Sequence, residues 1–423
     1  MRTNPPHGIM LVAGETSGDL LGAELVSALR RSPGWQAWPH EPRVFGAGGP
    51  LMRAAGVDIA LDLTRHAVVG LAEVVRRALE FRRLLQSLVD LACARQPDLL
   101  VGIDFSAFNR RLVRALRRRL AAQTGVFHNW RPRFVQYVSP QVWASRPRRA
   151  YGLARDYDLL LCLFSFEKEW YARRVPKLAV EWVGHPLLDR HATRLARPRA
   201  SPPASPSDPP TILLLPGSRV GELQAHLPVL LGAVERLRAG LRARFQLVLP
   251  NPGLRPLAER LGARDGPDFA VQVGGLAEAL DGATVAIAST GTVTLECALY
   301  GVPTVTFYKT SWTTYQFAKR LVTVAYAAMP NLLANAPVFP EFIQHAATPD
   351  NLADAARALL TDPARRNQIG QRLAQVVGSL GGPGASDRAA AAILGILNSP
   401  PRRRLSMGRD APHDFLAPMG ADL

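Results

Sequence analysis

Short apolar runs alternate with segments of helical periodicity along most of the chain, and this alternation limits what the chain can fold into. The run DLLVGI at 98–103 is almost wholly apolar, as expected for a strand buried on both faces. After a similar run at 9–13, Leu21, Leu25 and Leu29 follow the spacing of one helix face. Strands that alternate with helices predict βαβ units and therefore parallel sheets of the α/β class.

The alternation forms two series. We expect strands at 9–13, 43–46, 98–103, 134–138, 159–164 and 180–183 in the first series, and at 211–215, 245–249, 269–273, 284–288 and 303–307 in the second. The stretch between the two series reads RPRASPPASPSDPP, which has no periodicity and cannot hold a helix or a strand. The second series therefore begins a second folding unit.

Length supports two domains, because 423 residues are too many for one comfortable core. We predict two Rossmann-like domains, 1–197 and 211–398, with residues 198–210 as a linker or loop and 399–423 as a basic, disordered tail. The two domains should face each other across a cleft. Loops at the carboxyl ends of the parallel strands should line that cleft.

The chain is strongly basic, with a formal charge of +17 from 51 lysines and arginines against 34 aspartates and glutamates. The excess favours an anionic partner, either nucleic acid, a phosphorylated substrate or anionic lipid, although an arginine-rich composition alone would give the same charge. RNA binding would need aromatic residues interleaved with the basic ones as stacking platforms. The aromatic residues here are scattered, so we expect no nucleic-acid partner.

Cysteine usage and hydropathy indicate where in the cell the protein is expected to lie. Cys93, Cys162 and Cys297 stand singly in apolar stretches, as small core residues do in a reducing compartment. No stretch offers the roughly 18 consecutive apolar residues of a membrane-spanning helix. The first apolar run is far too short for a signal peptide, so we expect a soluble or peripheral protein.

Two candidate functional segments follow strands of the first series. The loop GETSGD at 14–19 either lines a substrate site with Glu15 and Ser17, or is a turn in which Ser17 or Asp19 caps the next helix. Asp104 directly follows the buried strand at 98–103. Its carboxylate either projects into the cleft as a general base or caps the following helix.

Two loops of the second series have the composition of phosphate-binding loops, LPGSR at 215–219 and STGT at 289–292. Small residues there let the backbone approach a diphosphate, and the following helix N-terminus favours negative charge. The candidate ligands are Gly217, Ser218, Arg219, Thr290, Gly291 and Thr292. Glu296 lies about one turn into the second helix, where its carboxylate can accept hydrogen bonds from ribose hydroxyls. Together the loops predict a nucleotide-diphosphate site.

Three further patterns are weaker. Asp156 and Asp158 have the spacing of a metal-binding DxD motif, but they precede a strand, so we expect a solvated start of that strand. His185 follows a strand as a cleft or turn residue, with no second His or Cys at metal-ligand spacing. The expected helix at 71–89 is amphipathic and basic, which fits either packing on its own domain or a membrane-surface role.

Nine motifs in order resemble those of the lipid-A-disaccharide synthase family of inverting glycosyltransferases. They are VAGETSGD from Val12, FGAGGPLM from Phe45, VGIDFSAFN from Val101, YVSPQVWA from Tyr137, FEKEWY from Phe166, VGHPL from Val183, LLPGSR from Leu214, STGTVTLE from Ser289 and MPNLLAN from Met329. The resemblance covers nearly the whole chain from Val12 to about Ile343. It implies two Rossmann-like domains in the GT-B arrangement, with neither a metal nor a cofactor.

The resemblance also implies a reaction. UDP-2,3-diacylglucosamine and 2,3-diacylglucosamine 1-phosphate would give the β-1,6-linked disaccharide 1-phosphate and UDP. On this interpretation Asp104 takes the proton of the acceptor 6-hydroxyl, while Arg219 and the backbone near Gly291 hold the departing diphosphate. His185, Gln316 and Asn331 are further cleft candidates by the same resemblance. The implied location is the cytoplasmic face of the inner membrane, with the anionic membrane surface as a partner, and a homodimer is left open.

This sequence departs from the family pattern in two places. Ser106 and Ala107 stand where the family commonly has a proline and an acidic residue, and Ser145 stands where a tryptophan is usual. Both changes predict altered local packing. The alternatives are an epimerase or another lipid-linked transferase of the same architecture, a non-catalytic lipid- or nucleic-acid-binding protein, and a relative that binds a UDP-sugar without turnover. Intact Asp104, Arg219 and Glu296 favour turnover.

Overall fold

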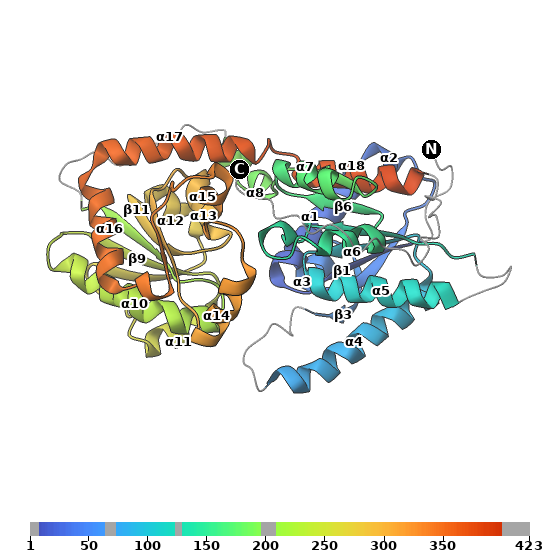
Figure 1. The fold of residues 1–423 in the computed structure, drawn as a ribbon, viewed down its shortest axis with the longest axis horizontal. Coiled ribbons are helices and arrows are strands. Elements are labelled where there is room, and N and C mark those ends of the chain that lie inside the picture. Colours follow the sequence, from blue (N-terminus) through green and yellow to red (C-terminus); the bar gives the residue numbers. More distant parts are fainter. Residues whose placement is uncertain (1–7, 64–72, 123–128, 196–208, 400–423) are drawn as a thin grey trace.

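A computed structural model describes residues 8–63, 73–122, 129–195 and 209–399 (Figure 1). Most of the predicted linker at 198–210 lies outside the described residues, as do the predicted tail beyond Ser399 and the first two residues of the helix predicted at 71–89. Two parallel sheets lie side by side, each flanked by helices (Figure 1). The predicted α/β class with two parallel sheets is therefore confirmed.

The first sheet has seven strands in the order β3-β2-β1-β4-β5-β6-β7, all parallel. Its strands are β1 Gly8–Ala13, β2 Arg43–Gly48, β3 Asp58–Asp62, β4 Leu99–Ile103, β5 Arg133–Tyr137, β6 Leu159–Cys162 and β7 Ala179–Trp182. Its helices are α1 Thr16–Arg31, α2 Pro33–Gln36, α3 Pro50–Ala54, α4 Glu73–Arg95, α5 Ser106–Ala122, α6 Arg149–Asp156, α7 Ser165–Arg174, α8 Leu187–Arg190 and α9 Ala192–Leu195, with a 3₁₀ turn η2 at Val142–Ala144.

The second sheet has six parallel strands in the order β10-β9-β8-β11-β12-β13. Its strands are β8 Thr211–Leu215, β9 Arg244–Leu249, β10 Phe269–Val273, β11 Val285–Ser289, β12 Thr304–Tyr308 and β13 Glu341–Ile343. Its helices are α10 Val220–Arg238, α11 Arg255–Arg260, α12 Leu276–Gly282, α13 Val293–Leu299, α14 Trp312–Leu321, α15 Met329–Ala334, α16 Pro349–Thr361 and α17 Pro363–Ser379, with 3₁₀ turns η3 at Pro252–Leu254 and η4 at Gln344–Ala346.

Burial on both faces explains why the central strands read as continuous apolar runs. In β1, Ile9 and Leu11 pack into the core on the side of α1, whereas Met10 and Val12 pack into the core on the side of α4 and α5. Each successive side chain therefore has to be apolar. β3 is an edge strand with polar, partly exposed residues, which is why no strand was predicted there.

The chain returns to the first domain at its C-terminal end. α17 runs along the second domain, and α18 (Ala385–Asn398) lies against α1 beside the first sheet (Figure 1). Ile393, Leu394 and Leu397 of α18 are buried in the same core as Leu25 of α1. The predicted second domain of 211–398 therefore differs from the structure in its last helix, which completes the core of the first domain.

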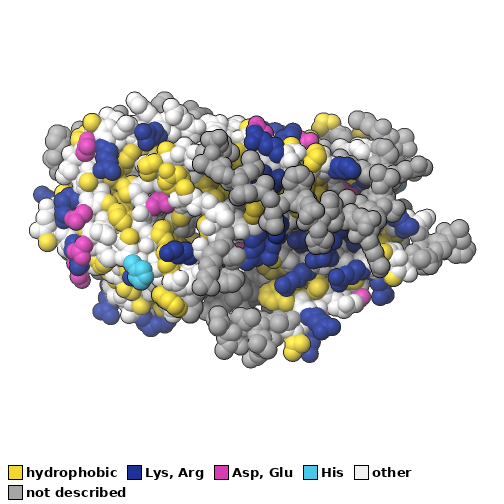
Figure 2. All heavy atoms as spheres, in the orientation of Figure 1, with side chains coloured by type: hydrophobic (Ala, Val, Ile, Leu, Met, Phe, Trp, Pro, Cys, Tyr) yellow, Lys and Arg dark blue, Asp and Glu magenta, His cyan; other side chains and the backbone are white. Residues whose placement is uncertain are grey.

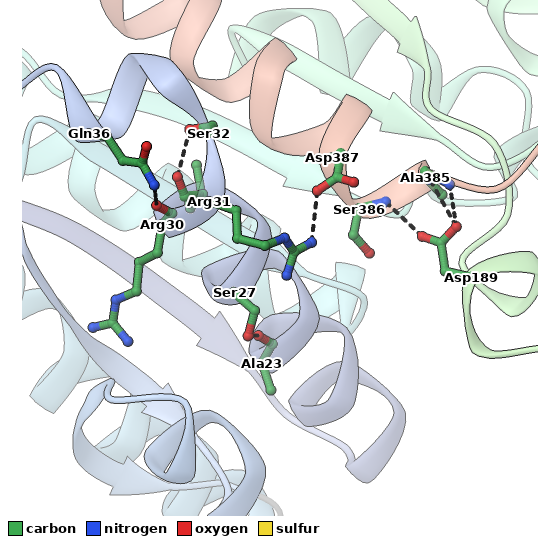
Figure 3. A network of polar contacts seen from close by, with 12 residues as sticks. Ala23, Ser27, Arg30, Arg31, Ser32, Gln36, Asp189, Ala385, Ser386 and Asp387 are labelled. Carbon is green, nitrogen blue, oxygen red and sulfur yellow. Dashed lines mark hydrogen bonds and ion pairs between the residues drawn. The ribbon is translucent and has the colours of Figure 1, made fainter. Parts of the chain in front are cut away.

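A side chain from α8 caps this returning helix. The carboxylate of Asp189 accepts the backbone N–H groups of Ala385 at 3.2 Å and Ser386 at 3.1 Å, as well as that of Gly384 (Figure 3). These donors have no partner within α18, because the first turn of any helix leaves its N–H groups free. An exposed ion pair between Arg31 and Asp387, 2.8 Å long, adds a second contact to α1 (Figure 3).

We expect Asp189→Ala to lower the free energy of unfolding by about 1–2 kcal/mol, because it removes the cap of α18. Urea denaturation followed by circular dichroism measures the change. Asp387→Ala is the matched control, since its ion pair is well exposed and should contribute only about 0.5 kcal/mol. Equal losses in the two variants would contradict the capping role.

Candidate active site

The first sheet reverses its direction of winding between β1 and β4, which are hydrogen-bonded neighbours with Ala13 opposite Ile103. Loops that leave two such strands diverge and open a crevice at the carboxyl edge, where open α/β sheets bind ligands. Glu15 and Ser17 follow β1, and Asp104 follows β4. The two candidate segments of the first half therefore meet at one point of the sheet.

Asp104 and Ser17 lie in contact at this point. The hydroxyl of Ser17 donates to Oδ2 of Asp104 at 3.3 Å, and the Asp104 side chain is half-buried. The backbone N–H of Asp104 donates to the carbonyl of Tyr137 at 2.8 Å, which extends the pairing of β4 with β5 by one residue. The Asp104 carboxylate is thus anchored to the sheet and remains accessible at the crevice.

Asp19 neither lines a substrate site nor caps the helix that follows its loop. It is buried, and its carboxylate accepts the backbone N–H groups of Gly49, Leu51 and Met52 at 2.8–3.0 Å. It therefore caps the short helix α3 and not α1. No side-chain cap is present at the start of α1, where Glu15 is the N-cap residue. Glu15 and Ser17 therefore do not cap α1 and stay candidate site residues.

The second sheet repeats this arrangement. β8 and β11 are neighbours on either side of its reversal point, and they lead into the loops LPGSR and STGT. Gly217 has φ of +111°, a conformation that favours glycine, and it turns the chain into α10. The N–H of Ser218 and that of Arg219 both donate to Glu222 Oε2, at 2.9 and 3.3 Å. These two donors, expected to be free for phosphate, are occupied by a carboxylate in this structure.

The STGT loop is open around Gly291. An added Cβ at Gly291 would meet no atom within 4 Å, so a ligand can approach the backbone there. Thr290 is tied to β12 through its N–H, which donates to the Phe307 carbonyl at 3.0 Å, and Thr292 is the N-cap residue of α13. Glu296 lies 3.7 Å from Nε2 of His191, a residue of the connection between α8 and α9. This places Glu296 beside the segment that leaves the first domain.

The loops of the two domains meet across the crevice. Nη2 of Arg219 lies 3.6 Å from Oε2 of Glu15, and its Nη1 lies 3.2 Å from Oε1 of Glu222. The Arg219 side chain is 67 % exposed, so its guanidinium is accessible to a ligand. An exposed arginine between two carboxylates at facing loops has the donor geometry that binds phosphate oxygens.

His185, Asn331 and Gln316 are the remaining candidates. His185 is buried where the chain of the second sheet returns to the first. Its backbone N–H donates to the Leu380 carbonyl at 3.2 Å, and its ring Nδ1 accepts the backbone N–H of Leu187 at 3.2 Å. Asn331 is fully buried, and its amide bonds the Phe339 backbone and Glu341 at 2.7–2.8 Å, so its side chain holds a loop and does not face the crevice. Gln316 is half-buried on α14.

The expectation of a solvated strand start at Asp156 and Asp158 was wrong. Both aspartates are buried, and Asp156 accepts a hydrogen bond from Nε of Arg110 at 2.7 Å. Asp158 accepts the N–H of Phe134 at 2.9 Å and Nη2 of Arg117 at 3.3 Å. These carboxylates therefore connect α5 with the end of α6 and with the segment that leads into β6. Among the described residues, no cluster of three or more His, Cys, Asp or Glu side chains could hold a metal.

A buried carboxylate that sequence reasoning missed holds the loop after β5. Glu167 of α7 accepts the hydroxyl of Ser139 at 2.9 Å and the indole N–H of Trp143 at 3.0 Å. Burial raises the pKa of Glu167, while these donors oppose the shift. At the end of this loop, the carbonyl of Ala144 accepts the N–H of Thr323 from the second domain at 2.9 Å. The motif FEKEWY contained this residue, but its partners are more than 20 residues away in the sequence.

The two parallel sheets with their facing loops have the GT-B arrangement. Among solved structures, the fold is similar to a putative UDP-N-acetylglucosamine 2-epimerase from Listeria monocytogenes, with a TM-score of 0.62, 15% identity and coverage of 98% of this chain and 100% of that one. It is also similar to the calicheamicin glycosyltransferase CalG4, with a TM-score of 0.54, 17% identity and coverage of 94% and 100%. These likenesses establish the fold alone.

Sequence comparison is more specific. The family model described as "Lipid-A-disaccharide synthetase" matches residues 9–394. Proteins named lipid-A-disaccharide synthase are similar to this chain, at 39% identity in Alkalilimnicola ehrlichii, covering 91% of this chain and 97% of the relative, and at 38% in Geobacter sulfurreducens, covering 94% and 99%. The chain belongs to the lipid-A-disaccharide synthase family.

We expect the stability of this protein to fall between about pH 6.5 and pH 4 because of His185. Burial lowers the pKa of His185 to about 4, and the charge of Arg190 adds to the effect. The unfolded chain therefore binds a proton in this window that the folded chain excludes, which disfavours folding by roughly 1–3 kcal/mol at the acid end. Above pH 6.5 the imidazole is neutral in both states and makes no contribution.

The measurement is urea denaturation of the wild type and of His185→Asn from pH 7 to pH 4. Asn keeps an acceptor for the Leu187 N–H without a titrating group. As the pH is lowered, the free energy of unfolding should fall more steeply for the wild type than for His185→Asn. The carboxylates titrate equally in both proteins, so the difference between the two curves reports on His185. Parallel curves would show that His185 is not excluded from protonation in the folded state.

Proposed function

We propose that this chain transfers 2,3-diacylglucosamine from its UDP-activated form to 2,3-diacylglucosamine 1-phosphate, forming the β-1,6-linked disaccharide 1-phosphate and UDP. The observation that carries the proposal is the meeting of Asp104 and Ser17 with Arg219 and Glu15 at the facing loops. A carboxylate and an exposed guanidinium at one crevice supply the two functions that this transfer needs, proton removal and stabilisation of the leaving diphosphate.

Asp104 is the proposed general base. Its carboxylate takes the proton of the acceptor 6-hydroxyl as that oxygen forms a bond to the anomeric carbon of the donor. The bond between this carbon and the diphosphate oxygen breaks on the opposite face, and its electron pair leaves with UDP. Attack from the face opposite the leaving group inverts the configuration, through an oxocarbenium-like transition state. The hydrogen bond from Ser17 keeps one carboxylate oxygen oriented and leaves the other for the proton.

The leaving diphosphate is proposed to bind at Arg219 and the open backbone of Gly291. Its phosphate oxygens would replace the Glu15 carboxylate beside the guanidinium. This exchange is favourable because the Glu15 contact is exposed and 3.6 Å long, and such pairs contribute little. A bidentate contact to phosphate is stronger, and it strengthens further as charge develops on the departing oxygen.

We expect Asp104→Asn to lower kcat by about 10²–10⁴-fold, the range of general-base catalysis, with an unchanged thermal midpoint. UDP release from the two substrates, with a chelator present, measures turnover. Asp354→Asn is the matched control, because Asp354 is an exposed residue of α16 and should leave turnover unchanged. Full activity of Asp104→Asn would move the base to another residue, and no turnover by folded wild type would indicate a different acceptor.

A membrane-surface location is part of the proposal, because both substrates carry acyl chains. α5 packs Leu112 and Leu116 into the core and exposes Arg111, Arg114 and Arg118 on its outer face. Figure 2 shows lysine and arginine side chains gathered over the half of the molecule that holds the first sheet. Among the described helices, none is long and apolar enough to cross a membrane. Attraction to anionic lipid on the cytoplasmic face of the inner membrane is therefore proposed to be electrostatic.

We expect the double variant Arg111→Ser, Arg118→Ser to bind anionic vesicles roughly 30-fold more weakly, because each near-surface arginine contributes about 1 kcal/mol. Vesicle co-sedimentation over a range of salt concentrations measures the binding, and added salt should weaken it. Arg365→Ser, Arg372→Ser is the matched control, two exposed arginines seven residues apart on α17 of the second domain. Salt-insensitive binding, or equal losses in both variants, would contradict this surface.

A further inference from the structure

The backbone at the site is held in a strained conformation. Asp104 has φ of +49° and Phe105 has φ of +35°, two consecutive residues with side chains in the left-handed region. Val138, at the end of the neighbouring strand β5, has φ of +67°. Each such residue costs on the order of 1–3 kcal/mol, and a β-branched residue is especially unfavourable there. Other contacts must therefore fix the backbone at these adjacent strand ends.

Two buried amides supply these contacts. Nε2 of Gln136 donates to the carbonyl of Asp104 at 2.7 Å, and Nδ2 of Asn109 donates to the same carbonyl at 3.0 Å. Nε2 of Gln136 also lies 3.3 Å from the carbonyl of Val138. Both side chains are 0 % exposed, so water cannot replace them readily. The strained carbonyl of Asp104 is therefore bound by two donors from beneath the crevice.

The strand provides room for both amides at Gly102. A Cβ added to Gly102 would lie 2.8 Å from Cβ of Asn109 and 2.8 Å from Oε1 of Gln136, closer than such atoms can approach. Any side chain at this position would push one of the amides away. The glycine two residues before Asp104 is thus part of the same arrangement.

The orientation of the Gln136 amide is fixed by a third residue. The hydroxyl of Tyr157, which is buried, donates to Oε1 of Gln136 at 3.1 Å. Burial raises the pKa of Tyr157, so the hydroxyl stays protonated and remains a donor. With its oxygen engaged by Tyr157, the amide presents its NH₂ group to Asp104. Oδ1 of Asn109 has no hydrogen-bond partner among the described residues, so this amide acts there only as a donor.

We propose that Gln136 and Asn109 are positioning residues, which hold the Asp104 carbonyl and so keep the left-handed turn that aims the Asp104 carboxylate at the crevice. Both act through Asp104, because they are fully buried and have no access to a substrate. The inference rests on the proposed role of Asp104 as the base. A misplacement of the base by about 1 Å is enough to lower the rate about 100-fold, so small shifts of this turn matter.

The test is Gln136→Met, which keeps the length of the side chain and removes its donors. We expect kcat to fall about 10- to 100-fold while KM for both substrates changes little, because binding is not affected. Gln246→Met is the control: Gln246 is likewise a glutamine on an inner strand, β9, but it lies in the second sheet and donates to Gln272 of β10, so the change should leave kcat as it is. Thermal midpoints establish that each variant is folded.

A double-mutant cycle separates positioning from a general structural loss. In the Asp104→Asn background the base is gone, so Gln136→Met should not lower the residual turnover further. An equal loss in both backgrounds would overturn the proposal, as would wild-type kcat in folded Gln136→Met while Asp104→Asn is inactive. Full activity of Asp104→Asn itself would instead show that the proposed base is wrong, and this inference would fall with it.

Tyr157→Phe tests the same arrangement more mildly, and it is decisive if Gln136→Met does not fold. The variant keeps the ring and removes only the hydroxyl that orients the Gln136 amide. We expect kcat to fall several-fold, with the loss again absent in the Asp104→Asn background. Unchanged kcat in folded Tyr157→Phe would overturn the orienting contact and, with an unfolded Gln136→Met, the proposal as a whole.

Discussion

Parallel strands end at one edge of their sheet, and the rest of this structure depends on where each sheet reverses its winding. The reversal points lie between β1 and β4 and between β8 and β11. They bring Ser17 to Asp104 in one domain and the LPGSR loop to the STGT loop in the other. The Arg219–Glu15 contact then joins the two crevices. Because that pair is exposed, it contributes little free energy and is easily replaced by a charged ligand.

Beneath these loops, buried polar groups make directional hydrogen bonds, which apolar packing cannot supply. The amides of Gln136 and Asn109 bind a strained carbonyl, and Glu167 holds the loop after β5. A buried polar group without a partner costs about 1–3 kcal/mol, so each of these networks is stable only in one arrangement. Directional contacts of this kind fix the loops at the crevice, whereas the cores on the two faces of each sheet fix only the strands.

The strands and the place of Asp104 were predictable because the causes are local. A strand buried on both faces must be apolar at every position, and a polar residue directly after it lies at the carboxyl edge. β3 and β13 were missed because they are short and partly exposed at the edges of their sheets. The capping role of Glu222 could have been predicted from the sequence, because a carboxylate three residues after the N-cap of a helix often accepts the N–H groups at the helix start.

The remaining features depend on partners far away in the sequence. The burial of Asp158 depends on Arg117, 41 residues earlier, and that of Asn331 depends on a loop that folds back onto it. The packing of α18 on the first domain has no local signal either. α18 packs against α1 through residues far apart in the sequence; Arg31 and Asp387, for example, are 356 positions apart.

The position of α18 bears on the order in which the chain can fold during synthesis. Domains generally fold as units, with the N-terminal one first as it leaves the ribosome. Here the core that contains β1 and α1 is completed by Ile393 and Leu397, which are translated after the entire second domain. The first domain therefore waits with an uncovered apolar face while the second is made. A chain that ends within the second domain lacks α18 and therefore cannot close the core of the first.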